Sequence, residues 1–247
     1  MNKVQLVFLG SGDAFGSGSR LQSCILIKAN QNMILLECGA SSMIALRKYQ
    51  VDYDNIRLVL VSNLHGDQFG GIPYFIWDAQ LNRKRNNPLV IAGPRGIKEK
   101  YPQLMESTFP GSEGMKTRFP LEIVELEANI QWIYEGITVI PFPVVHADND
   151  PHLAFRISMG EKDLAYSGDT GWTESLVSAA SGADLFIAES YFYAAKLKYH
   201  LDYQALIANQ NRLNAKSLVI THMSEDMLDR LHDVVCDYAE DGKILEF

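Results

Sequence analysis

The stretch that decides the fold runs from Val59 to Gly71 and reads VLVSNLHGDQFGG. Its first half is apolar and rich in β-branched residues, which predicts a buried strand. The glycines that follow predict a tight turn into a helix. Because side chains alternate between the faces of a strand, Asn63, His65 and, if the chain stays extended, Asp67 would point the same way. Open α/β sheets bind ligands at such strand ends, although a stray histidine in a solvated turn would give the same short pattern.

The composition limits the class of protein. The chain has 247 residues, 47% of them hydrophobic, and we expect residues 1–247 to form a single domain with a full core. The formal net charge of −8 argues against indiscriminate binding to nucleic acid or to an anionic membrane. The three cysteines, Cys24, Cys38 and Cys236, form no CxxC pair, which is typical of a reducing compartment.

The sequence predicts a soluble, cytoplasmic protein without a membrane partner. Its apolar runs are all well short of the roughly 20 residues that span a bilayer. The apolar part of the N-terminus is too short for a signal peptide and instead predicts a first strand.

Strands and helices are interspersed along the rest of the chain. Strands are expected at residues 3–9, 23–29, 33–38, 89–92 and near 121–127, 130–134 and 137–142, and helices at residues 41–50, 69–83, 95–108 and around His232. This order fits an α/β (α+β) fold in which two mixed sheets pack face to face with helices outside.

The loop from Gly10 to Gly18 contains four glycines in nine residues. Since no Lys-Ser/Thr pair follows it and the next segment is strand-like, the loop does not predict a nucleotide-binding P-loop. We expect the glycines to let it pack tightly beside the site.

Further polar candidates follow apolar, strand-like runs. They are His146 after Pro143-Val-Val, Asp169 after Tyr166-Ser-Gly, Glu189 at the end of the run from Asp184, and His222 after the run from Leu218. His200 follows Glu189 closely in sequence. His152 and His232 fit no such pattern, and we expect both to be surface or packing residues.

Together these motifs resemble those of the metallo-β-lactamase superfamily, whose metal loop reads His-x-His-x-Asp-His before a glycine-rich turn. Asn63 stands in place of the first histidine and Gln68 in place of the last, while His65 and Asp67 are retained. The other motifs match in order: His146 the third metal histidine, Asp169 the bridging aspartate and His222 the last histidine. The resemblance implies an αββα sandwich of two mixed β-sheets flanked by helices.

The strand before this loop departs from the superfamily in one position. It commonly ends in Asp-Cys-Gly there, whereas here it ends in Glu37-Cys38-Gly39. Whether the longer acid supports the metal loop in the same way is left open by the sequence.

Within the superfamily the chain is most similar to ribonuclease Z and related phosphodiesterase-like hydrolases. The similarity is carried by GSGDAF at residues 10–15, SGDT at 167–170, THMS at 221–224 and the segment from Glu189 to Asp202. Residues 143–152 and 189–200 are too few to form the arm with which ribonuclease Z grips tRNA, so tRNA is not the expected substrate. The resemblance implies a small-molecule or nucleotide-like phosphoester substrate and, because ribonuclease Z relatives often pair, a homodimer.

The resemblance also implies two divalent ions, most simply zinc. The matching positions are Asn63, His65 and His146 at one ion, Asp67, Gln68 and His222 at the other, and Asp169 between them. Because a carboxamide binds zinc less well than an imidazole does, this motif is degenerate at both ions.

Three outcomes remain open at this point. The site could hold one ion, mainly through His65, His146 and Asp169 with His222. It could hold two ions, such as manganese or iron rather than zinc, at partial occupancy. Alternatively it could hold no metal, with the two amides hydrogen-bonded to the remaining ligands.

We therefore expect a metal-dependent hydrolase that acts on a phosphodiester or related ester through a metal-bound hydroxide, with an impaired or single-metal site. In the matching roles, Asp67 would orient or deprotonate the water. His200, partnered by Glu189, would donate a proton to the leaving oxygen or hold the phosphate. The alternative is a catalytically inactive superfamily member that binds a nucleotide or phosphate ligand without turnover.

Overall fold

The computed structural model describes residues 4–29, 32–112, 114–146 and 151–247. The first sheet contains β1 (Val4–Gly10), β2 (Cys24–Ala29), β3 (Asn32–Leu36), β4 (Ile56–Leu60), β5 (Leu89–Gly93), β6 (Leu121–Glu125) and β14 (Ile244–Glu246). The second contains β7 (Trp132–Tyr134), β8 (Ile137–Val144), β9 (His152–Met159), β10 (Lys162–Tyr166), β11 (Leu185–Glu189), β12 (Leu218–Thr221) and β13 (Asp237–Tyr238). Within the described residues the strand orders are β14-β1-β2-β3-β4-β5-β6 and β13-β12-β11-β10-β9-β8-β7.

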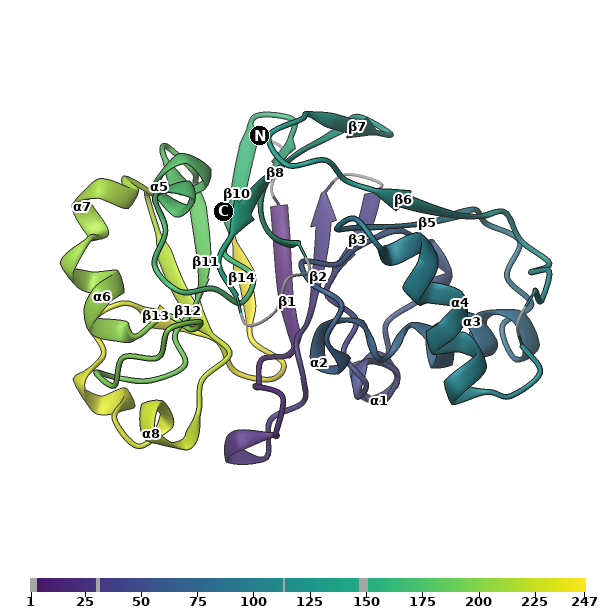
Figure 1. The fold of residues 1–247 in the computed structure, drawn as a ribbon, viewed down its shortest axis with the longest axis horizontal. Coiled ribbons are helices and arrows are strands. Elements are labelled where there is room, and N and C mark those ends of the chain that lie inside the picture. The colour runs from purple at the N-terminus through teal and green to yellow at the C-terminus, as the bar shows by residue number, and fades with distance from the viewer. Residues whose placement is uncertain (1–3, 30–31, 113, 147–150) are drawn as a thin grey trace.

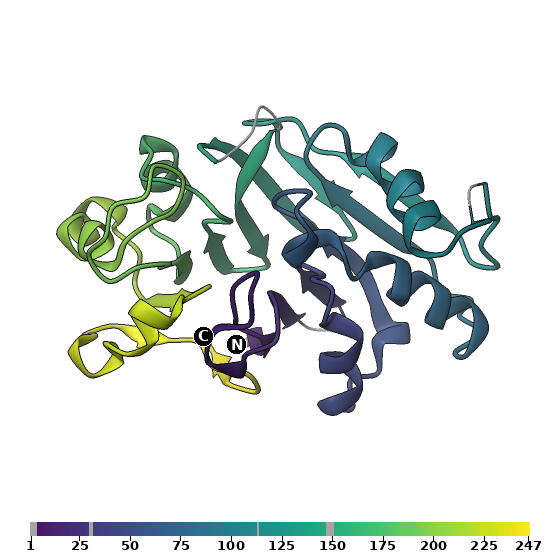
Figure 2. The same cartoon turned by 60° about the horizontal axis from the view of Figure 1, so that its bottom comes forward.

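Helices cover the outer faces of both sheets (Figure 1 and Figure 2). In the first half of the chain they are α1 (Ser42–Lys48), α2 (Gly66–Phe69), α3 (Ile72–Leu81) and α4 (Ile97–Thr108). In the second half they are α5 (Glu174–Ala180), α6 (Tyr203–Ala208), α7 (Gln210–Leu213) and α8 (Glu225–Leu228). Every helix in the described part of the chain is too short or too polar to cross a bilayer. The architecture is the αββα sandwich that the sequence predicts.

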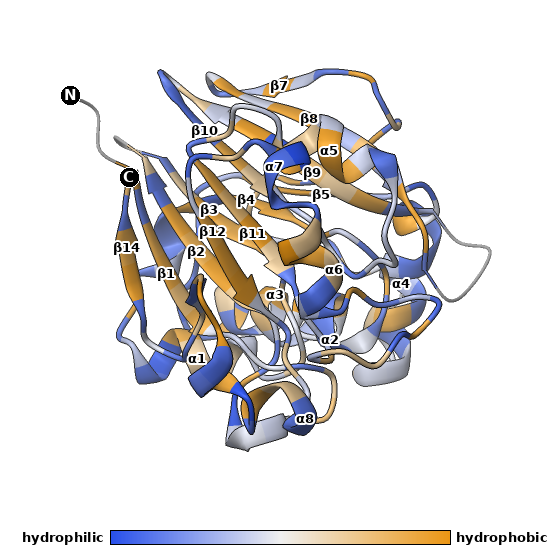
Figure 3. Cartoon of the chain, turned by 90° about the vertical axis from the view of Figure 1, so that its left-hand side faces the viewer, coloured by the Kyte–Doolittle hydropathy of each residue, from blue (hydrophilic) through white to orange (hydrophobic). Residues whose placement is uncertain are grey.

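Three apolar clusters hold the layers together. One lies between the sheets, and the other two lie between each sheet and its helices. On β1, Leu6 and Phe8 belong to the cluster between the sheets, whereas Val7 and Leu9 belong to the cluster under the helices. A strand covered on both faces must be apolar at successive positions, which explains its unbroken run. Figure 3 shows the strands mostly in the hydrophobic colour.

The direction of the strands sets the position of the site. Strands β3, β4, β5 and β6 run parallel to one another, and so do β10, β11, β12 and β13. The carboxyl ends of parallel neighbours lie at one edge of a sheet. Polar residues that follow these strands are therefore gathered together although they are far apart in the sequence.

Three local predictions differ from the structure. Strand β4 ends at Leu60 and α2 begins at Gly66, so Asp67 is helical and does not continue the strand's alternation. The helix expected at 69–83 is divided into α2 and α3 at the glycine pair ending in Gly71. His232 lies in a short 3-10 turn, Leu231–Asp233, instead of a C-terminal helix.

The turn after β3 and the start of α3 are in close backbone contact. Gly71 N–H donates to the Cys38 carbonyl over 2.8 Å, and Cys38 N–H donates to the Gln68 carbonyl over 2.7 Å. A Cβ atom on Gly71 would lie 2.1 Å from the Gly39 carbonyl oxygen, and one on Gly39 would lie 2.2 Å from the Asp67 carbonyl oxygen. The chain can approach this closely because neither position carries a side chain.

We expect Gly71→Ala to destabilise the protein, since its methyl group would push two backbone segments apart. Overpacking of this kind costs about 1–3 kcal/mol or more in free energy of unfolding, and each kcal/mol lowers Tm by about 2–4 °C for a chain of this size. Gly66→Ala is the matched control, because a Cβ there meets nothing within 4 Å. Circular dichroism during heating measures both, and equal Tm values for the two variants would contradict the prediction.

Candidate metal site

Nine described residues line a cavity of about 230 Å³ at the strand ends. They are Ala14, Phe15, His65, Asp67, His146, Asp169, Tyr191, His200 and His222. The segments that follow β1, β4, β8, β10, β11 and β12 all contribute to it. The structure therefore gathers in one cavity all the histidines and aspartates that the sequence singles out as ligands.

His65, His146 and Asp169 form the first group of candidate ligands. One ligand atom from each lies within 4.8 Å of the others, and ligand atoms on a single tetrahedral zinc ion are about 3.3 Å apart. His146 donates from Nδ1 to the Tyr199 carbonyl over 2.8 Å, which leaves Nε2 for an ion. The Oδ1 atom of Asp169 is buried and has no hydrogen-bond partner among the described residues. These three side chains therefore fit a divalent ion.

Asn63 is fully buried beside this group, but its side-chain oxygen already accepts a hydrogen bond from the backbone. Its Oδ1 accepts the backbone N–H of His65 over 2.9 Å, and its Nδ2 donates to Asp169 Oδ2 over 3.3 Å. Bonding of an Asn side chain to the backbone two residues on is the Asx-turn. In this structure Asn63 shapes the loop and supports Asp169, and it offers no oxygen to the first group.

Gln68 lies in the middle of the second group, which is Asp67, Asp169 and His222. Its Nε2 donates to Asp169 Oδ2 over 2.6 Å and to Asp67 Oδ2 over 2.9 Å, and it lies 3.5 Å from His222 Nε2. The amide nitrogen thus takes up the space among the ligand atoms where a second ion would be held. Its oxygen, Oε1, is buried without a hydrogen-bond partner among the described residues.

His222 is surrounded by carboxylates in this cluster. Burial lowers the pKa of His222, but the carboxylates around it outweigh burial and raise that pKa well above its ordinary value. They are Asp67 at 3.1 Å and Asp169 at 3.7 Å from Nε2, and Glu189 at 3.6 Å from Nδ1. Its backbone has a φ of 56°, a left-handed conformation that is uncommon for residues other than glycine and is found at functional sites.

The carboxylates respond to their surroundings in different directions. Burial raises the pKa of Asp169, and His222 offsets this in part. Burial also raises the pKa of Asp67, but the hydrogen bond and charge of His222 outweigh it, so the pKa of Asp67 is lowered. Asp67 is therefore a carboxylate at neutral pH, whereas an added cation would offset the effect of burial on Asp169.

Glu189 and His200 form the expected pair. His200 Nδ1 lies 2.8 Å from Glu189 Oε2, and the other carboxylate oxygen accepts the N–H groups of Thr170 and Leu201. Burial lowers the pKa of His200, but its hydrogen bond to Glu189 and that carboxylate's charge raise it above the ordinary value. The Tyr191 ring stacks on the His200 ring with 4.7 Å between centroids, which fixes the plane of the imidazole.

His152 and Tyr191 belong to the site although sequence reasoning did not place them there. His152 is buried, with its ring 4.8 Å from the His146 ring and 5.5 Å from the His65 ring between centroids. It packs against two candidate ligands. It is therefore a packing residue, as expected, and the residues it packs against are those of the site. His152 lies at the start of β9, where it pairs with Val144 on β8. A prediction that these two strands pair would have placed His152 near His146. His232 is exposed.

Glu37 supports the loop despite its extra methylene group. Both of its carboxylate oxygens accept the Ser62 backbone N–H at 3.1 Å. The side chain is fully buried, and burial raises its pKa well above the ordinary value. The acid therefore anchors the residue just before Asn63.

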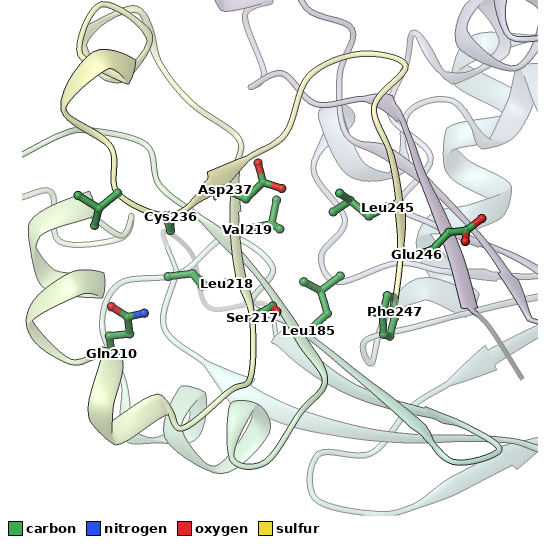
Figure 4. A pocket seen from close by; sticks show the side chains of 11 residues that line it. Leu185, Gln210, Ser217, Leu218, Val219, Cys236, Asp237, Leu245, Glu246 and Phe247 are labelled. Atoms are coloured by element: carbon green, nitrogen blue, oxygen red, sulfur yellow. The ribbon is translucent and has the colours of Figure 1, made fainter. Parts of the chain in front are cut away.

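A second cavity, of about 350 Å³, lies away from these residues. Figure 4 shows it between Leu185, Leu218 and Val219 on one side and Leu245 and Phe247 on the other. It lies at the amino ends of β11 and β12, whereas Glu189 and His222 follow their carboxyl ends. Its lining is not the candidate metal site.

Comparison with known proteins agrees with the fold and the motifs. Residues 4–244 match the family model of anti-Pycsar protein Apyc1. Ribonuclease Z of Ignicoccus hospitalis is 25% identical, over 91% of this chain and 89% of its own length.

Two solved structures have the same fold. YhfI from Bacillus subtilis, a metallo-β-lactamase fold protein, covers 100% of both chains with a TM-score of 0.81 at 20% identity. A diphosphatase from the PhnP family covers 100% of this chain and 98% of its own, with a TM-score of 0.80 at 17% identity. They confirm the metallo-β-lactamase fold that the sequence motifs imply.

The Glu189–His200 pair predicts how stability depends on pH in metal-free protein. Because the folded pKa of His200 is raised, the stability that it contributes is fully present below its unfolded pKa of about 6.5 and is lost as the pH rises through the folded value. His200→Gln should therefore cost more free energy of unfolding at pH 6 than at pH 9. Urea unfolding after chelation measures this, with the exposed His232→Gln as control. An equal loss at both pH values would contradict the prediction.

Proposed function

Because the chain belongs to the family of anti-Pycsar protein Apyc1 and has the metallo-β-lactamase fold of ribonuclease Z-like proteins, we propose that it is a metal-dependent hydrolase. Its substrate would be a phosphodiester or related phosphoester of a small, nucleotide-like molecule. The observation that carries this proposal is the convergence of His65, His146 and the unpartnered Oδ1 of Asp169 in one cavity. The Glu189–His200 pair borders the same cavity.

We propose a site for one ion. His65, His146 and Asp169 supply three strong ligands, and catalytic zinc sites commonly have three protein ligands and one open position. A second ion would have to displace the Gln68 amide from Asp67 and Asp169, and would at best gain a neutral amide oxygen in return. Imidazole and carboxylate together suit zinc, with manganese or iron as alternatives.

The chain's own residues would perform the remaining steps. A bound ion would supply positive charge for the phosphoester oxygen and lower the pKa of water. Asp67, held as a carboxylate by His222, would orient that water or accept its proton. His200, with its raised pKa, would hold the phosphate or donate a proton to the leaving oxygen, and Glu189 would fix which nitrogen faces the substrate.

The size and charge of the cavity favour a small substrate over tRNA. A volume of about 230 Å³ is below the range of about 300–1,000 Å³ that is usual for drug-sized ligands. The described residues that line it include no lysine or arginine. Because nucleic-acid chains are bound chiefly through Lys and Arg contacts to many phosphates, this lining supports recognition of a single phosphoester group.

Protein purified without chelator should contain about one zinc, manganese or iron ion per chain and hydrolyse bis-p-nitrophenyl phosphate. His65→Ala should lose both the ion and turnover. His200→Ala should keep the ion and lower kcat by about 10²–10⁴-fold, the usual contribution of an acid–base residue. Elemental analysis and absorbance at 405 nm measure these effects, with His232→Ala as the unchanged control. Protein with no metal and no turnover under added zinc or manganese would defeat the proposal.

The position of the Gln68 nitrogen also favours a second candidate, an inactive protein that binds a nucleotide or phosphate without turnover. The double variant Asn63→His, Gln68→His separates the two. We expect it to bind about two ions per chain, since both missing imidazoles are restored. Gln103→His, an exposed change on α4, controls for adventitious binding to a new histidine. If the parent is inactive and the double variant gains activity, the binding protein is favoured. A parent that is as active as the double variant excludes it.

A further inference from the structure

Phe15 is an apolar ring held out in solvent at the mouth of the candidate site. It is 85% exposed, more than any other large apolar side chain in the described part of the chain. It also lines the cavity together with the histidine and aspartate cluster. Burying a phenylalanine side chain contributes about 1.5–3 kcal/mol to stability. Because Phe15 is exposed, it does not make this contribution to the stability of the fold.

The loop that carries Phe15 is fixed by hydrogen bonds. The buried Asp13 carboxylate accepts the N–H groups of Phe15 and Ser17 over 3.2 and 2.9 Å and the Ser17 hydroxyl over 2.8 Å. Gln22 Nε2 donates to the Ala14 carbonyl over 3.0 Å. Ordering a side chain or loop on binding costs free energy, so a loop that is ordered in advance makes binding stronger.

The two aromatic rings that line the cavity differ in their surroundings. Tyr191 stacks on His200 and meets Phe192 edge to face at 4.8 Å. Phe15, by contrast, is 85% exposed, and the ring pairs found among the described residues, such as those of Tyr191, do not include it. The faces of Phe15 are therefore open to a ligand, whereas Tyr191 is already part of the wall.

The polar and apolar parts of the cavity would recognise different parts of a substrate. The histidines and aspartates of the candidate metal site, here called the ligand cluster, suit a phosphoester group, as does His200. Because the cavity is small, the remainder of the substrate would lie at its rim, beside Phe15. A planar, aromatic base gains about 1–3 kcal/mol by stacking on an aromatic side chain, with little dependence on which base it is.

We propose that Phe15 is the residue that selects for an aromatic base: the base of a nucleotide-like phosphoester stacks on its ring while the phosphate occupies the ligand cluster. This inference rests on the proposed function, since it takes the phosphoester site as given. It adds that compounds with a base are preferred over those with the sugar and phosphate alone, and that purine and pyrimidine bases are both accepted.

Isothermal titration calorimetry of the metal-containing protein with AMP, UMP and ribose 5-phosphate tests the proposal. The three probes share a ribose and a phosphate, and two carry a base. We expect AMP and UMP to bind about 5- to 140-fold more tightly than ribose 5-phosphate, which corresponds to one stacked base. Phe15→Ala should remove this preference and leave the affinity for ribose 5-phosphate unchanged. Phe15→Trp should retain the preference.

Ile44→Ala is the matched control, because Ile44 is 63% exposed on α1 and does not line the cavity. It should keep the preference for a base. Binding of ribose 5-phosphate without any gain for AMP or UMP would overturn the role of Phe15 and leave the phosphoester site intact. If none of the three probes binds, the inference fails, whereas metal content and turnover of bis-p-nitrophenyl phosphate decide the proposed function separately.

Size-exclusion chromatography of the same variants distinguishes a contact between copies of this chain. A changed oligomeric state in Phe15→Ala, with the preference for a base retained, would assign Phe15 to an interface and overturn the proposal. An unchanged oligomeric state together with a lost preference would support it.

Discussion

The constraint on which this structure depends is the burial of Asp67, Asp169 and Glu189 at the edge where the two sheets meet. Buried carboxylates are tolerated only when protons, hydrogen bonds or cations compensate their charge. Glu189 obtains this from His200 and from backbone N–H groups, and Asp67 obtains it from His222. Asp169 receives amide hydrogens on Oδ2 and nothing at hydrogen-bond distance on Oδ1 among the described residues. The negative charge of Asp169 is therefore the least compensated of the three, and this carboxylate lies beside the imidazoles of His65 and His146.

Much of the fold and of the site could be predicted from the sequence because strand ends have simple signals. An apolar run followed by a polar residue identifies a position at the edge of a sheet, and this was sufficient to find His146, Asp169 and His222. The orientation of an amide side chain has no such signal. The Asn63 oxygen turns to the His65 N–H because a short Asx-turn is available, and this depends on where β4 ends. His152 was missed for a related reason, since its contact with His146 follows from the pairing of β8 with β9.

Whether Glu37 can support the metal loop is a question that the sequence leaves open and the structure answers. The sequence shows a longer acid where the superfamily has aspartate, which could weaken the support of the loop. In the structure both carboxylate oxygens reach the Ser62 N–H, and the Cys38 N–H and Gly71 N–H bonds join the neighbouring turns. The glycines at 39 and 71 permit this approach because any Cβ there would overlap a carbonyl oxygen. The loop is thus positioned by backbone contacts and by Glu37, in addition to the bond from the His65 N–H to the Asn63 side chain.

In the proposed single-ion hydrolase, the exchange of two imidazoles for amides would also change which groups act in catalysis. With two ions, positive charge on both sides of a phosphoester can be supplied by metal. With the Gln68 nitrogen among the second group of ligands, positive charge on that side would have to come from imidazoles. His222 is hydrogen-bonded to Asp67, whereas His200 lines the cavity. His200 would therefore supply both charge and a proton, and its raised pKa keeps it protonated to higher pH than an ordinary histidine. An exposed Phe15 at the rim would complement such a site, because stacking on a base would add affinity without adding charge to a chain that is already acidic.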